Sequence, residues 1–121
     1  MNDETKIWLE YAIENLQSAE VLLNSELYNP CLQNVQQSVE KTLKSILIEN
    51  SIGLKKTHSI NELKNNGITV DISDGECDFL DSIYLPSKYP IGSVLPYFEP
   101  ICSQSVAIAK RVLKIVQTIL K

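Results

Sequence analysis

The chain has 121 residues, of which 44% are hydrophobic and 21% are charged, and its net charge is −4. This length suits a single domain that buries enough surface to fold without a disulfide or a metal. The composition argues against disorder, and the negative charge excludes a basic surface spread over the whole molecule for duplex nucleic acid. We therefore expect one domain over residues 1–121.

Membrane and secretory segments are not predicted. No apolar run is long enough for a transmembrane helix, and the polar N-terminus lacks the basic start and apolar stretch of a signal peptide. The cysteines, Cys31, Cys77 and Cys102, are odd in number and far apart, which argues against a disulfide framework or a zinc cluster. We expect a cytoplasmic protein with no metal and no cofactor.

Two long amphipathic helices are predicted in the first half of the chain, because apolar residues recur there at three- and four-residue spacing. The first covers residues 4–26, with a buried stripe of Trp8, Tyr11, Ala12, Leu16, Ala19, Leu22 and Leu23. The second runs from Pro30 to about Asn50, with Asn29 as its N-cap. Its buried stripe consists of Leu32, Val35, Val39, Leu43, Ile46 and Leu47.

Two shorter helices are predicted from capping-box spacing, in which a serine precedes a glutamate by three positions. Ser59 begins a helix that continues through Leu63, and Ser73 begins a helix from Asp74 to about Tyr84. Between them, residues 68–72 alternate as a strand would, but the chain offers no second strand for pairing. We interpret these residues as an extended connector.

The segment from Leu85 to Pro100 contains four prolines, which predicts a break without a continuous helix. A last helix is predicted from about Ile101 to Lys121. Its stripe consists of Val106, Ala109, Val112, Leu113, Val116 and Leu120. Three long helices and two short ones, with no credible sheet, predict an all-α, up-and-down bundle of four or five helices.

Four segments of the chain match a known pattern in order and spacing. The first predicted helix is aromatic-rich, ends in Leu22 and Leu23, and is followed by Tyr28. Residues 36–44 read QQSVEKTLK, similar to QxAEKxLK, and residues 57–63 read THSINEL, similar to THxLxxL. Residues 84–90 read YLPSKYP, similar to YxxxRYP. Together these segments resemble the HEPN family, the higher eukaryotes and prokaryotes nucleotide-binding domain, in its small stand-alone prokaryotic type.

The resemblance implies an HEPN-like bundle, similar to nucleotidyltransferase substrate-binding subunits and commonly a homodimer. It implies frequent pairing with a minimal nucleotidyltransferase, often as a toxin–antitoxin pair, and roles in nucleotide binding or RNA cleavage. The family's ribonucleases carry an arginine followed a few residues later by a histidine, and no such motif follows Arg111. Lys88 also replaces the arginine of the RYP turn, which keeps the charge but loses the planar fork.

These departures favour a binding module for a nucleotide or an RNA phosphate, partnered by a nucleotidyltransferase, over a self-sufficient enzyme. Two alternatives remain open at this point. The first is a metal-independent ribonuclease with a non-standard site, and the second is a purely structural oligomer.

The candidate ligand-binding residues are mainly lysines. Lys41 and Lys44 are three positions apart on one helix, Lys56 follows that helix, and Lys88 lies in the proline-rich turn. If the fold gathers them, they form an anion site for a phosphate, whereas the simpler interpretation is a solvated lysine face. Tyr89, beside Lys88, is a further candidate that can stack on a base.

His58 is the only histidine of the chain and completes the candidate set. It is a candidate general base, a role for which it needs a partner or a nucleophile nearby. The simpler interpretation is that its ring packs at the entrance of the following helix and hydrogen-bonds the backbone.

Overall fold

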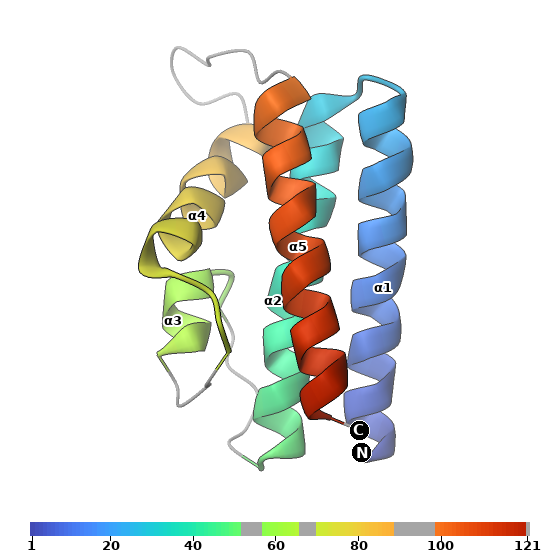
Figure 1. Cartoon of the computed structure of the whole chain (residues 1–121), viewed down its shortest axis with the longest axis vertical. Coiled ribbons are helices and arrows are strands. Elements are labelled where there is room, and N and C mark those ends of the chain that lie inside the picture. Colours follow the sequence, from blue (N-terminus) through green and yellow to red (C-terminus); the bar gives the residue numbers. More distant parts are fainter. Residues whose placement is uncertain (52–56, 66–69, 89–98, 121) are drawn as a thin grey trace.

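The computed structural model describes residues 1–51, 57–65, 70–88 and 99–120, with the backbone alone over residues 83–88. Its helices are α1 (Asp3–Asn24), α2 (Tyr28–Glu49), α3 (Ile60–Lys64), α4 (Asp74–Lys88) and α5 (Glu99–Ile119). The three long helices stand side by side, α3 and α4 cover one flank, and the two termini lie together at one end (Figure 1). The predicted all-α bundle is confirmed, and α2 contacts each of the other helices.

Helix α1 packs on the bundle through small and aliphatic residues. Ala12 and Ala19 are fully buried, and Leu9 and Leu16 lie beside them, so the alanines let α2 approach closely. The prediction that Tyr11 belongs to the buried stripe is wrong, because its side chain is 57% exposed. Position 11 lies about 120° around the helix from the centre of the row of Leu9, Ala12, Leu16 and Ala19.

Helix α2 begins at Tyr28, two residues before the predicted start. The prediction of Asn29 as N-cap is wrong, since the cap position is Leu27 and no side chain caps this helix. Pro30 therefore lies within the first turn, where its missing N–H leaves no intrahelical bond unmade.

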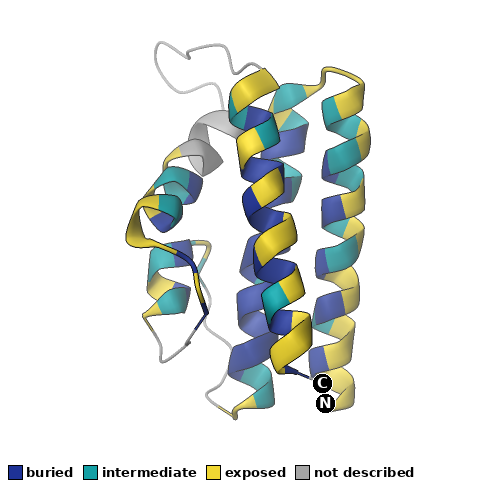
Figure 2. Ribbon diagram, in the orientation of Figure 1, coloured by how far each residue is buried: buried dark blue, intermediate teal, exposed yellow. Residues whose placement is uncertain are grey.

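The core lies between α1, α2 and α5, where the facing surfaces are buried (Figure 2), and it extends to α3 and α4, where Ile60, Leu63 and Leu80 are fully buried. Every residue of the stripe predicted for α2 is buried, and so is every residue of the stripe predicted for the last helix. Ser38 of α2 is also fully buried, and its hydroxyl donates to the Ala12 carbonyl oxygen at 2.8 Å. The polar group thus enters the core with its hydrogen bond made.

Both predicted capping serines are confirmed. The Ser59 hydroxyl accepts from the Glu62 backbone N–H at 3.2 Å. The second box is reciprocal, since the Glu76 N–H donates to the Ser73 hydroxyl at 3.1 Å and the Ser73 N–H donates to the Glu76 carboxylate at 3.0 Å. Each short helix therefore begins where its serine predicts.

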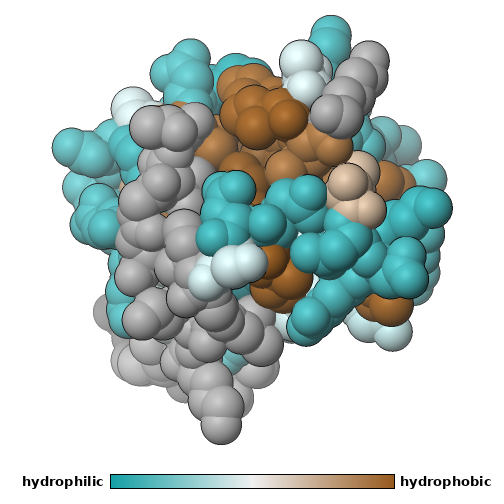
Figure 3. Space-filling model, turned by 90° about the horizontal axis from the view of Figure 1, so that it is seen from below, coloured by the Kyte–Doolittle hydropathy of each residue, from teal (hydrophilic) through white to brown (hydrophobic). Residues whose placement is uncertain are grey.

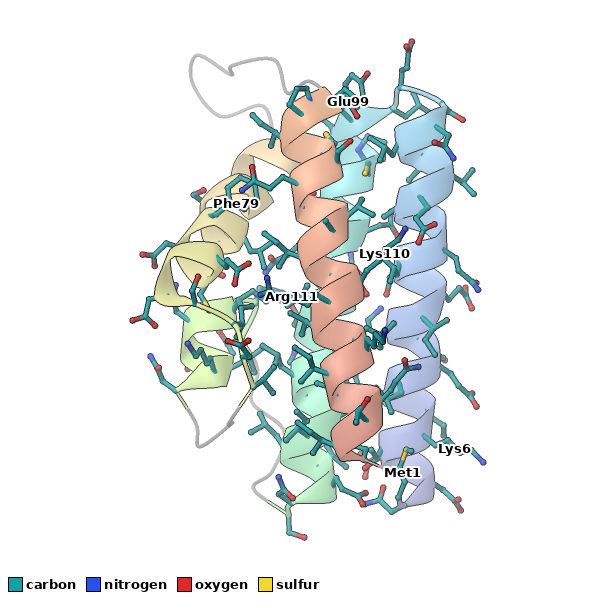
Figure 4. All side chains as sticks on the ribbon, viewed as in Figure 1. Met1, Lys6, Phe79, Glu99, Lys110 and Arg111 are labelled. Carbon is teal, nitrogen blue, oxygen red and sulfur yellow. The ribbon has the colours of Figure 1, made fainter. Side chains whose placement is uncertain are left out.

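Carboxylates tie the flank of the bundle together. Asp81 of α4 accepts from the backbone N–H groups of Ile60 and Asn61 at 2.6 and 3.1 Å, which joins α4 to the start of α3. Arg111 of α5 donates to both carboxylate oxygens of Glu76, at 2.8 and 2.5 Å. Figure 4 shows Arg111 pointing from α5 toward the α4 side.

Two predicted boundaries near the prolines are wrong. Helix α4 continues to Lys88 instead of ending near Tyr84. Pro86 therefore lies in its last turn, two residues before the helix ends. Helix α5 begins at Glu99, with Pro100 in its first turn, where a proline is tolerated. The rest of the proline-rich segment, residues 89–98, lies outside the described residues.

Within the described ranges, no helix has both the length and the apolar content needed to cross a membrane. Seen from the end that carries both termini, hydrophobic side chains gather into a patch bordered by hydrophilic ones (Figure 3).

No strand occurs in the part of the chain that the structure describes. In the predicted connector, Val70 and Ile72 are buried, and residues 68 and 69 lie outside the described residues.

Candidate functional site

The polar residues of α2 fall into two rows, and each row makes a different set of contacts. Gln36, Glu40 and Lys44 recur at four-residue spacing and so share one face of the helix. Lys41 and Asn34 lie on the adjacent face, toward α1. The two rows produce two sites, which we call the Glu40 cluster and the Lys41 pocket.

The Glu40 cluster consists of Glu40, Lys44, Gln36, His58 and the Trp8 ring. Glu40 accepts a hydrogen bond from Nζ of Lys44 at 3.0 Å, and the side chains of this pair are 7% and 8% exposed. The other Glu40 oxygen lies 2.7 Å from Nδ1 of His58. The Lys44 ammonium also lies over the ring of Trp8, 5.8 Å from its centre. Both buried charges therefore have a direct partner.

Helix α2 holds His58 by its backbone as well as by its ring. Gln36 is fully buried, and its Nε2 donates to the His58 carbonyl oxygen at 2.6 Å. Among the described residues, Oε1 of Gln36 meets no hydrogen-bond donor. An ionised Glu40 can only accept, so Nδ1 of His58 carries the proton in this pair. The His58 side chain is 64% exposed, so α2 presents an oriented imidazole at the surface.

The Lys41 pocket has a different chemistry. Nζ of Lys41 donates to the Asn15 and Gln37 side-chain oxygens at 2.8 and 3.4 Å and lies 5.6 Å from the centre of the Tyr11 ring. Asn15 in turn donates to the Asn34 oxygen at 3.0 Å. All of these partners are neutral, so the ammonium is fixed in place without a carboxylate bound to it.

An open cavity of about 440 Å³ surrounds this ammonium. It is lined by Tyr11, Glu14, Asn15, Ser18, Asn34 and Lys41. Partial burial lowers the pKa of Lys41, while the nearby charges of Glu40 and Glu14 oppose that shift. A second, shallower groove of about 520 Å³ adjoins it and is lined by Glu14, Gln17, Ser18, Val21, Leu22 and Asn34.

The predicted ligand residues lie in different environments. Lys44 and His58 are brought together by Glu40, whereas Lys41 lies in the separate pocket against α1. Lys88 is the last residue of α4, with a side chain that the structure does not describe, and Lys56 and Tyr89 lie outside the described residues. No group of three metal-binding side chains occurs in the described ranges.

Several site residues were missed from the sequence. Tyr11, Asn15 and Asn34 line the Lys41 pocket, and a matched amide pair on two helices leaves no periodic signal in one sequence. Glu40 was missed as the partner of His58 although both lie in the matched segments. The i,i+4 spacing of Glu40 and Lys44 is the signal that was available for that cluster.

Comparison with known proteins gives a consistent picture. The family model described as HEPN domain matches residues 5–121. The crystal structure of TT1696 from Thermus thermophilus is similar, with a TM-score of 0.83 and 24% identity over 97% of this chain and 98% of that chain. The structure of ST0689, described as an archaeal HEPN homologue, has a TM-score of 0.78 and 28% identity over 97% and 98% of the two chains. A search among curated proteins finds no match.

Proposed function

The chain belongs to the HEPN domain family, and from that premise we propose that it is a binding module that holds a phosphate of a nucleotide or an RNA at Lys41. The observation that carries the proposal is the set of partners around this ammonium, which are an aromatic ring and two neutral amide oxygens. A cation held in this way keeps its charge for an incoming anion.

The neighbouring lysine supports this assignment by contrast. Lys44 lies in a buried ion pair with Glu40, so its charge is already compensated and its role is structural. Lys41 opens onto a cavity of about 440 Å³, a size that suits part of a small ligand. Phosphate binding is therefore assigned to Lys41 rather than to a lysine cluster.

The other groups of the Lys41 pocket suit the rest of a nucleotide. The Tyr11 side chain is 57% exposed, so its ring offers a face for stacking a base. The amides of Asn15 and Asn34 offer hydrogen-bonding groups in fixed orientation. Glu14 also lines the pocket and repels a polyanion, so a single nucleotide suits the site better than a long RNA.

The proposal extends to assembly. The family commonly forms homodimers that pair with a minimal nucleotidyltransferase as toxin and antitoxin, and we propose the same cytoplasmic arrangement for this chain. Light scattering on the purified protein tests the dimer. Co-expression with a minimal nucleotidyltransferase, followed by purification of one tagged partner, tests the pairing.

The phosphate site is tested by calorimetric titration of the protein with adenosine and guanosine monophosphates. We expect Lys41→Gln to weaken binding by about tenfold or more, which corresponds to about 1.4 kcal/mol. Lys114→Gln on the exposed side of α5 removes the same charge and is expected to change nothing. Equal binding by wild type and Lys41→Gln would refute the assignment.

A second candidate function is a metal-independent ribonuclease that uses His58 as general base. The observation in its favour is the Glu40 carboxylate, which fixes the imidazole as catalytic carboxylates do. Against it, Arg111 is held by Glu76 in an ion pair on the flank of the bundle. RNA incubated with the protein in chelator distinguishes the two functions, because cleavage that is lost in His58→Ala would establish the enzyme.

A further inference from the structure

Helix α1 has an outward face that is largely exposed. Ile7 and Val21 are 51% and 64% exposed and lie opposite the buried row of this helix, and Tyr11, 57% exposed, lies at the edge of the face beside Lys41. Figure 2 shows exposed residues along the outer edge of α1. From Ile7 to Val21 the face extends for about 21 Å at the rise of an α-helix.

The charged residues on this face are mostly acidic. Asp3, Glu10 and Glu14 are all exposed and lie on the same outward side as the three apolar residues. Lys6 lies at the edge of the face and Lys41 lies in the pocket on its α2 side. The face therefore combines exposed apolar surface with a net negative charge.

From this combination we infer that the outward face of α1 docks a basic amphipathic helix of a partner protein. Apolar residues of that helix cover Ile7, Tyr11 and Val21, and its lysines or arginines meet Glu10 and Glu14. The groove of about 520 Å³ beside Val21 accepts one side chain of the partner helix. The inference shares with the proposed function the premise that this module has a protein partner, and the two surfaces share Tyr11 and Glu14 at the edge of the Lys41 pocket.

The charge pattern also excludes two other occupants. A second copy of the chain would dock through the same patch on both molecules, so two surfaces that each carry three acids and only Lys6 as a counter-charge would meet and repel each other. A membrane surface carries anionic headgroups, and these would repel Asp3 and the two glutamates. Charge complementarity therefore selects a basic protein segment.

A peptide titration tests the docking surface. The probe is a synthetic amphipathic helix with a leucine face bordered by lysines, and its control carries glutamates in place of the lysines. We expect the lysine peptide to bind the full chain at least about tenfold more tightly than the glutamate peptide, with an affinity that falls as salt rises. Equal binding of the two peptides would overturn the inference.

Variants locate the binding. Val21→Lys and Glu10→Lys change exposed residues that do not line the Lys41 pocket, and each is expected to weaken the lysine peptide by about tenfold. The double variant Gln104→Lys/Gln117→Lys changes the net charge as much as Glu10→Lys does, but on the exposed side of α5, and it should bind as wild type does. Unchanged binding by Val21→Lys and Glu10→Lys would contradict the assignment of the face.

The same variants separate this inference from the proposed function. Val21→Lys should bind the peptide more weakly and bind nucleotides as wild type does. Lys41→Gln should bind nucleotides more weakly and bind the peptide as wild type does. If the wild type is a dimer and Val21→Lys makes it a monomer, the face belongs to a second copy and the inference is wrong.

Discussion

The Glu40 cluster and the Lys41 pocket each contain a lysine of α2, but the two lysines have different partners. In the cluster, Lys44 is buried and bound to a carboxylate that also holds His58. In the pocket, Lys41 is partly buried and bound to amide oxygens. The two lysines therefore differ in their partners rather than in their place in a motif, and the proposed phosphate site depends on that difference.

The largest effect is expected in the Glu40 cluster. Glu40→Leu leaves the Lys44 ammonium buried without its carboxylate and should lower the free energy of unfolding by about 3 to 5 kcal/mol. Urea unfolding followed by circular dichroism measures this loss. The control is the double variant Glu40→Leu/Lys44→Leu, which removes both charges and should recover most of the stability. A single variant as stable as the double one would show that the ion pair is not buried as described.

A matched pair of substitutions sharpens the comparison directly. Lys44→Met should destabilise the fold by about 2 kcal/mol, because Glu40 then keeps only His58 as a partner for its buried charge. Lys41→Met, three residues earlier, should change the free energy of unfolding by less than about 1 kcal/mol, because its ammonium has no carboxylate bound to it. Equal losses in the two variants, measured by urea unfolding, would remove the distinction between the two sites.

The sequence predicted the fold better than it predicted the site. The stripes of α2 and α5 follow helical periodicity without interruption, and both are buried as expected. Tyr11 was misassigned because the sequence pattern counts an aromatic residue next to the buried row as apolar, whether or not its ring faces the core. The boundaries near Pro30 and Pro100 were misplaced because a proline is tolerated in the first turn of a helix, whereas α4 continues for two residues past Pro86.

The candidate site was harder to predict, for a physical reason. Lys41 and Lys44 look equivalent in the sequence, and they are distinguished by their partners, which are the Asn15 amide for Lys41 and the Glu40 carboxylate for Lys44. The polar contacts between helices, such as that of Asn15 with Asn34, depend on how two helices are rotated against each other. One sequence without its packing does not specify that rotation.

Placing a carboxylate in the Lys41 pocket tests whether neutral partners matter. Asn15→Asp is nearly isosteric and converts one acceptor of Lys41 into a carboxylate, as in the Glu40 cluster, while it also removes the N–H that Asn15 donates to Asn34. We expect the fold to be kept and the affinity for nucleoside monophosphates to fall by about tenfold. Gln104→Glu adds the same charge on the exposed side of α5 and should leave the affinity unchanged. Undiminished binding by Asn15→Asp would mean that the phosphate is held elsewhere.

The smallest effect is expected from the ion pair of Glu76 with Arg111, which is more exposed than the Glu40–Lys44 pair. Hydrogen bonds from Arg111 lower the pKa of Glu76 from 4.5 to about 2. A folded-state pKa below the unfolded one gives stability that is present above pH 4.5 and lost as the pH falls toward 2. Because the side chains of Glu76 and Arg111 are 23% and 44% exposed, solvent screening limits the contribution to about 1 kcal/mol.

Urea unfolding between about pH 5 and about pH 3 measures this contribution in wild type and in Arg111→Met. The wild type should lose stability more steeply on acidification, since the variant lacks the guanidinium that keeps Glu76 ionised. Identical pH dependence in the two proteins would show that the pair contributes nothing measurable. A loss of stability larger than that of Glu40→Leu would mean that the exposed Glu76–Arg111 pair contributes more than the buried Glu40–Lys44 pair. That result would contradict the expected ranking of buried over exposed pairs.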